Sequence, residues 1–266
     1  MTGHMGLTPK QTDELNDLRN RDKKLTDRQV IRMAYLLERA GPVLGKTAEA
    51  VVHEAWLRKE YGRIKEIQSK YLDKGIEVEE DSITLVTKLT NQLYVKNQER
   101  KTDEWFTGEC DIKNKDTVID VKSSWDIHTF HKAECTHSNK WQVMCYMHLW
   151  KKEKGAVAYC LIDTPDHILN DEFRRTAWKL NIYDGDINEP KYDQLKYQIA
   201  KNMLFTDEAF KVAKSAYFPT ADTSDWIPIP DELRIKWFDV EWQPEMIELA
   251  KERVKLANEF YETITL

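Results

Sequence analysis

Two aspartates and a lysine lie close together near the middle of the sequence, in a pattern that could do chemistry. Asp111 comes just before a short turn, and Asp120 and Lys122 follow it. Side chains two apart on a strand share one face, so Asp120 and Lys122 should point the same way, with Ile119 and Val121 facing a core. Carboxylate oxygens are the ligands that Mg²⁺ prefers in proteins. The pattern predicts a Mg²⁺ site, which Mn²⁺ can also fill.

A third acidic group is expected from the acidic run at 77–81. In a helix, Glu79 shares a side with Ile83, and Ile76 lies three residues earlier. This apolar side should meet the sheet and turn Glu79 inward. We therefore choose Glu79 as the third ligand, with Glu80 as the second choice.

Several neighbouring groups could assist hydrolysis of a phosphate ester. Bound Mg²⁺ lowers the pKa of a water molecule and stabilises charge on a phosphoryl oxygen. Lys122 could position or deprotonate that water, or neutralise the developing charge. Gln142 and Tyr146 are four apart on an expected helix and share one face. They could hold a water molecule, a phosphate oxygen or Lys122.

The motifs Gly-x-x-x-Glu, G-x-x-D, D-x-K and Q-x-x-x-Y, in this order, resemble the PD-(D/E)XK nuclease superfamily. Within it they are most similar to phage lambda exonuclease and YqaJ-like viral recombination nucleases. The residues that take the metal and catalytic places in this likeness are Glu79, Asp111, Asp120, Lys122, Gln142 and Tyr146. The carbonyl of Val121 is expected as a further metal ligand. Cys110 stands where the superfamily's name places proline, and Asp120 replaces the commoner glutamate.

This resemblance, which covers residues 60–165, implies a Mg²⁺-dependent deoxyribonuclease. The expected role is a phage-type exonuclease that resects duplex DNA ends for recombination, as a phage or prophage protein in the cytoplasm of a bacterial cell. A single-strand annealing recombinase is the expected protein partner, and the oligomeric state stays open. The alternatives are a structure- or sequence-specific endonuclease on the same core and a non-catalytic nucleic-acid-binding protein that keeps the fold.

A second group of metal-binding residue types was weighed for zinc. His128, His131, Cys135 and His137 crowd a short span, but their spacing matches no familiar zinc finger. The four cysteines are too spread for an iron–sulfur cluster, and we expect free thiols. We therefore favour the acidic site over a zinc site.

The elements that must position these residues indicate an α/β fold, with a restriction-endonuclease-like mixed sheet flanked by helices. Helices are expected to begin at Thr8-Pro9, after Thr26, at Lys46 and after Gly75, and a long helix at Pro244. The expected strands cover 92–95, 105–112, 117–123, 155–162 and 234–240. We predict one nuclease domain, with helical residues 1–70, a catalytic core at 71–165, and C-terminal helices with a last strand at 166–266.

Composition limits the class of protein. The chain has 266 residues and a net charge of −6, so DNA phosphates would have to meet local basic groups. No apolar run reaches the length of a membrane helix, and the first residues lack the features of a signal peptide. The local basic groups available for phosphate contacts are Arg19, Arg21, Lys23, Lys24, Arg28, Lys65, Lys70 and Lys74.

Overall fold

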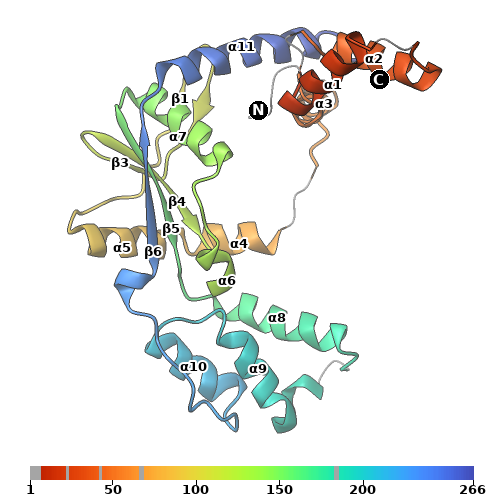
Figure 1. The fold of residues 1–266 in the computed structure, drawn as a ribbon. Coiled ribbons are helices and arrows are strands. Elements are labelled where there is room, and N and C mark those ends of the chain that lie inside the picture. The colour runs from red at the N-terminus through yellow and green to blue at the C-terminus, as the bar shows by residue number, and fades with distance from the viewer. Residues whose placement is uncertain (1–6, 22–23, 42–43, 66–68, 183–185) are drawn as a thin grey trace. The chain divides into compact units, whose positions relative to one another are not determined.

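The computed structural model describes residues 7–21, 24–41, 44–65, 69–182 and 186–266. The chain forms two compact units (Figure 1). One comprises residues 1–66 with 243–266, and the other comprises residues 67–242. The predicted organisation as one nuclease domain stays a prediction, because two compact units can still serve one function.

The first unit is helical, and its helices begin where the sequence predicts. It contains α1 (Pro9–Arg19), α2 (Asp27–Glu38), α3 (Lys46–Tyr61) and α11 (Pro244–Tyr261). Thr8 and Gln11 form a reciprocal capping box, in which Thr8 N donates to Gln11 Oε1 at 2.9 Å. Gly62 ends α3 in the left-handed region at φ 62°.

The core of this unit differs in detail from the expected apolar face of α3. Ala48 and Val52 are buried against Ala257 of α11, whereas Val51 is 52% exposed. The helical periodicity of the sequence predicts Val51, Val52, Ala55 and Trp56 as the core face of this helix, and the inclusion of Val51 is wrong. A helix turns about 100° per residue, so two neighbours cannot both face one narrow contact.

The second unit is built on a four-stranded mixed sheet. In spatial order its strands are β3 (Ile112–Lys113), β4 (Thr117–Ser123), β5 (Lys154–Cys160) and β6 (Ile235–Glu241). β4 and β5 are parallel, and the other two pairings are antiparallel. The turn between β3 and β4 is closed by Asn114, whose Oδ1 accepts from the backbone N–H of Asp116 and Thr117. The expected hairpin is therefore present.

Two helices pack against opposite faces of this sheet. Ile83 and Val86 of α5 (Glu79–Thr90) lie in one apolar cluster with Ile119 and Val121 of β4. The alternate side chains of β4 face α7 (His137–Trp150). A Cβ on Gly155 of β5 would overlap Val143 of α7, so glycine permits this close packing. The predicted mixed α/β core with flanking helices is confirmed (Figure 1).

Among the remaining elements, the helices between residues 166 and 217 pack into an apolar cluster of their own. These remaining elements are α4 (Lys70–Glu77), β1 (Lys101–Thr102), β2 (Thr107–Gly108), α6 (Ile127–His131), α8 (Asp166–Lys179), α9 (Asp193–Ala200), α10 (Asp207–Tyr217) and short 3₁₀ turns at Asp186–Asn188, Pro190–Tyr192 and Asp231–Leu233. None of the helices in the described ranges combines the length and apolar character needed to cross a membrane.

Three expectations about these elements were wrong. Gly75 lies inside α4 instead of before a helix, and a second helix begins at Glu79. Residues 92–95 form a loop, with only a single bridge from Lys96 to Ile112. The expected strand 105–112 is divided, because β2 pairs with β1 while β3 pairs with β4. Residues 109–111, between β2 and β3, belong to no strand.

Candidate active site

Asp120 and Lys122 lie together on one face of β4. Asp120 is only 1% exposed, and its Oδ2 lies 2.9 Å from Lys122 Nζ. Burial raises the pKa of Asp120 above its usual range, Lys122 opposes this rise, and the nearby charge of Glu79 adds to it. The expected sharing of one strand face is therefore met, with a buried carboxylate balanced by an ammonium.

Asp111 comes just before β3 and lies near Asp120 of β4, whose charge acts on it. The antiparallel register pairs Ile112 with Ile119, which brings the residue before Ile112 close to the residue after Ile119. Asp111 Oδ2 accepts a 2.6 Å hydrogen bond from Val121 N. Burial, with repulsion from Asp120, raises the pKa of Asp111 to about 7. The carboxylates of Asp111 and Asp120 thus lie in one region that is largely shielded from water. A single negative charge is accommodated there more easily than two.

Glu79 is the first residue of α5, and its side chain is 22% exposed. Its Oε2 accepts a 2.9 Å hydrogen bond from Lys96 Nζ. The charge of Glu79 contributes to the raised pKa of both aspartates, whereas Glu80 is exposed. The structure therefore turns Glu79, not Glu80, towards the aspartates.

The donor set fits a hard divalent cation in chemical type, because Glu79, Asp111 and Asp120 are carboxylates whose charges act on one another. Asp120 Oδ2 is buried and accepts no hydrogen bond of acceptable geometry from the described residues, although Lys122 is within ion-pair distance. No three His, Cys, Asp or Glu side chains within the described ranges are grouped closely enough to hold a metal ion. In this arrangement Lys96 and Lys122 neutralise two of the carboxylates.

Gln142 and Tyr146 lie on α7, as expected, and contact each other. Gln142 Nε2 donates to Tyr146 Oη at 2.9 Å. Burial raises the pKa of Tyr146 to about 12, and the charges of Asp120 and Asp111 add to the rise. A Cβ on Gly108 would lie 2.7 Å from Tyr146 Cε1, so the glycine of the G-x-x-D motif makes room for this ring.

Two groups beside the site were not found from the sequence. Lys96 pairs with Glu79 from a loop that carries no motif. Tyr159 of β5 is in register with Lys122, and its Oη accepts a 2.6 Å hydrogen bond from Asn139 Nδ2. The parallel pairing of two predicted strands could have indicated Tyr159, but no local signal in the sequence points to Lys96.

The residues weighed for zinc lie on and around α6 and the start of α7. His137 Nε2 accepts a 2.7 Å hydrogen bond from Trp141 Nε1, which occupies one possible ligand atom. His128 and His131 belong to α6, and Cys135 lies in the loop before α7. All four cysteines are free thiols, as expected.

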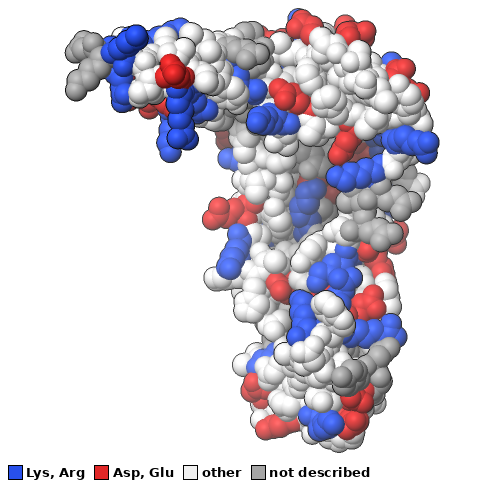
Figure 2. Space-filling view, turned by 90° about the vertical axis from the view of Figure 1, so that its right-hand side faces the viewer, with Lys and Arg blue, Asp and Glu red and all other residues white. Residues whose placement is uncertain are grey.

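The basic residues considered for phosphate contacts differ in availability. Lys74 is buried and donates to Trp125 O at 2.8 Å, so it was wrong to expect a surface contact from it. Lys70 is paired with Glu172 at 2.6 Å, and Lys23 lies outside the described residues. On the face drawn in Figure 2, basic and acidic side chains are mixed over much of the surface.

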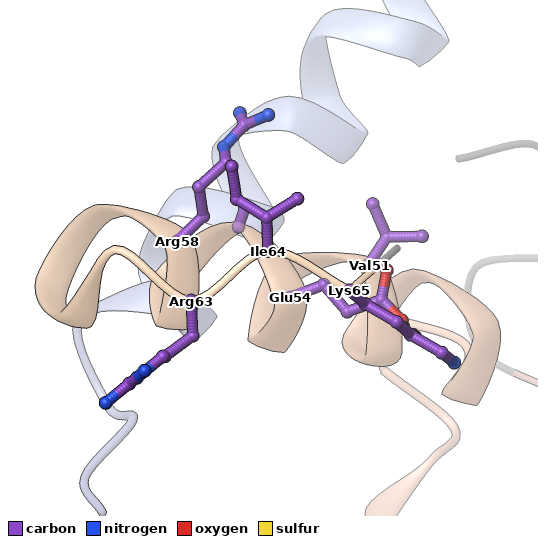
Figure 3. Close-up of a pocket in the computed structure, with 7 residues that line it drawn as sticks. Val51, Glu54, Arg58, Arg63, Ile64 and Lys65 are labelled. Atoms are coloured by element: carbon purple, nitrogen blue, oxygen red, sulfur yellow. Dashed lines mark ion pairs between the residues drawn. The ribbon is translucent and has the colours of Figure 1, made fainter. Parts of the chain in front are cut away.

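A hollow in the helical unit is lined by both apolar and charged residues. It holds about 250 Å³ between α3 and the segment that follows Gly62. Figure 3 shows Arg58 and Arg63 pointing away from each other, while Lys65 lies along Glu54. These cations do not converge on a common ligand, so we do not include the hollow in the candidate site.

Comparison with known proteins places this core in a fold class. No protein-family model matches the sequence, and no curated protein matches it. The fold is the restriction-endonuclease-like fold of a solved phage-related exonuclease from Haemophilus somnus 129PT. That structure is 23% identical, with a TM-score of 0.58 over 93% of this chain and 92% of the other.

A more distant similarity is to an alkaline exonuclease from Laribacter hongkongensis. It is 11% identical, with a TM-score of 0.49 over 82% of this chain and 81% of the other. A second structure of that enzyme, in complex with dAMP, is 10% identical with a TM-score of 0.46. At these identities the likeness concerns the fold alone.

Proposed function

We propose that this chain is a divalent-metal-dependent DNA nuclease. The observation that carries the proposal is the proximity of Asp111 to Asp120, whose charge raises the pKa of Asp111, with Glu79 and Lys122 beside them. Such a group of carboxylates and an ammonium suits phosphodiester hydrolysis. The fold shared with a phage-related exonuclease adds support at the level of the fold.

Glu79, Asp111 and Asp120 would hold Mg²⁺ or Mn²⁺, with the carbonyl of Val121 as a further ligand. When bound, the ion would activate a water molecule and stabilise charge on a phosphoryl oxygen. Lys122 lies on the same face as Asp120 and would orient that water as an ammonium or, as the neutral amine, accept its proton. The hydrogen-bonded pair of Gln142 and Tyr146 would support Lys122 or bind a phosphate oxygen.

The finer role that we propose is resection of duplex DNA ends for recombination in a phage or prophage context. It rests on the motif resemblance together with the shared fold. A single-strand annealing recombinase is the proposed partner, because resection leaves a single strand that such a protein would bind. An endonuclease on the same core is the alternative within the same chemistry.

One observation favours a second candidate, a DNA-binding protein that lacks catalysis. The described carboxylates are not grouped as a three-ligand metal cluster. Digestion of end-labelled linear DNA and closed circular DNA, each with Mg²⁺ and with EDTA, separates the candidates. Our proposal expects Mg²⁺-dependent loss of linear DNA alone. Cutting of circles would indicate an endonuclease, and gel-shift binding without cutting in any metal would contradict nuclease activity.

A further inference from the structure

Lys96 contacts the candidate site although it belongs to no motif. Its Nζ lies 2.9 Å from Glu79 Oε2, and its side chain is 35% exposed. Glu79 is the first ligand that we propose for the metal ion. An ammonium is therefore bound to one of the two oxygens of a carboxylate that we propose as a metal ligand.

The backbone fixes Lys96 at this place. Lys96 forms a β-bridge with Ile112, and Asn97 N donates to Asp111 O at 2.7 Å. Asn97 is only 5% exposed, and its Nδ2 donates to Cys110 O at 2.9 Å. The loop is thus held against the segment that carries Asp111, so the position of Lys96 is part of the fold and not a chance surface contact.

The charges around Lys96 explain what it does there. The carboxylates that act on its ammonium are those of Glu79, Glu80 and Asp111. The negative charges of these three carboxylates repel one another, and a cation among them offsets that repulsion. The ammonium of Lys122 balances the charge of Asp120 on β4, and the ammonium of Lys96 balances the charge of Glu79.

We propose that Lys96 is a built-in counter-cation, which neutralises Glu79 until a divalent ion takes its place. This inference rests on the proposed function, since it assumes that Glu79 binds metal. An ammonium and a divalent ion on the same carboxylate repel each other, so metal binding must release the Lys96–Glu79 ion pair. Lys96 therefore acts as a positioning residue that holds Glu79 in place before metal binds and weakens metal binding.

Mn²⁺ titration by calorimetry tests this proposal on the full chain. Lys96→Met removes the charge but keeps much of the side chain's length, and it should tighten Mn²⁺ binding by about tenfold, the order of effect expected for one nearby charge. The melting temperature without metal should fall, and the rise caused by Mn²⁺ should be larger than in the wild type. A merely structural role would loosen metal binding instead.

Two further variants serve as controls. Lys113→Met removes a lysine of β3 that forms its ion pair with Glu99 and not with Glu79, Asp111 or Asp120, and it should leave the Mn²⁺ affinity unchanged. Lys96→Arg keeps the positive charge, so it should retain an affinity close to that of the wild type. Equal tightening in the Arg and Met variants would overturn the proposal, because side-chain shape and not charge would then be responsible.

The test distinguishes failure of this inference from failure of the proposed function. In one outcome the wild type binds Mn²⁺ and Glu79→Gln loses this binding. If folded Lys96→Met then binds Mn²⁺ with an unchanged or lower affinity, only the role of Lys96 is overturned. Absence of any Mn²⁺ binding by the wild type would overturn the metal site and the inference together. If Lys96→Met does not fold, a lower Mn²⁺ affinity in Lys96→Gln than in the wild type would overturn the proposal, and a higher one would support it.

Discussion

At the scale of single residues, the two aspartates differ in how their charge is compensated. Asp120 has Lys122 at 2.9 Å, whereas Asp111 Oδ2 accepts a backbone hydrogen bond from Val121. A backbone N–H offsets less charge than an ammonium does. Asp111 is therefore the acid whose protonation should respond most visibly to pH and to a bound cation.

A pH dependence of stability follows from the pKa of Asp111, which is raised from 3.8 to about 7 in the folded chain. Between pH 3.8 and about 7, the Asp111 carboxyl group is deprotonated in the unfolded chain and keeps its proton in the folded chain. This group therefore lowers the free energy of unfolding as pH rises from 3.8 to about 7. Without metal, Asp111→Asn should flatten that part of the profile in urea unfolding, and an unchanged slope would contradict the assignment.

Lys122→Ala should remove most of the turnover while DNA binding is retained. The reason is that Lys122 is the ammonium placed to act on the attacking water, and general acid–base groups contribute about 10²–10⁴-fold. Turnover at saturating DNA and Mg²⁺ measures the loss, and Lys113→Ala is the matched control, since Lys113 pairs with Glu99 instead. Undiminished turnover in Lys122→Ala would remove this lysine from the mechanism.

At the scale of elements, the parts of the site that follow strand and helix periodicity could be predicted from the sequence. The alternation in β4 correctly separated Asp120 and Lys122 from Ile119 and Val121. The spacing of Gln142 and Tyr146 correctly placed them on one face of α7, where they also contact each other. These relations are local, so a few residues of sequence suffice to determine them.

Relations between distant segments could not be predicted in the same way. Lys96 reaches Glu79 because its loop bridges to Ile112, and no sequence period encodes that pairing. The expected strand at 105–112 is divided for a similar reason, since its ends pair with β1 and β4. Such pairings depend on the packed structure as a whole.

Gly108→Ala tests the packing of α7 against the site. The new Cβ would lie 2.7 Å from Tyr146 Cε1, so the ring must move. Overpacking of this kind costs about 1–3 kcal/mol of unfolding free energy. Gly75→Ala in α4 is the control, because no atom lies within 4 Å of its added Cβ, and it should stabilise the chain by up to about 1 kcal/mol. Equal effects of the two substitutions in urea unfolding would contradict this packing account.

At the scale of the whole molecule, each of the two units is compact in its own right. The acidic site belongs entirely to the unit of residues 67–242, and α11 packs with α3 in the other unit. The net charge of −6 and the mixed surface in Figure 2 mean that DNA would be held by local contacts. The proposed hydrolysis can therefore be tested by substitutions at the acidic site, within the unit of residues 67–242.

The central claim is that Glu79, Asp111 and Asp120 together bind a divalent cation. A crystal soaked with Mn²⁺ tests it most directly, because the anomalous signal of manganese locates the ion. We expect a peak within bonding distance of carboxylate oxygens from all three residues, with Lys96 displaced from Glu79. A peak elsewhere, or none at this site in a crystal whose protein cleaves DNA with Mn²⁺, would contradict the account.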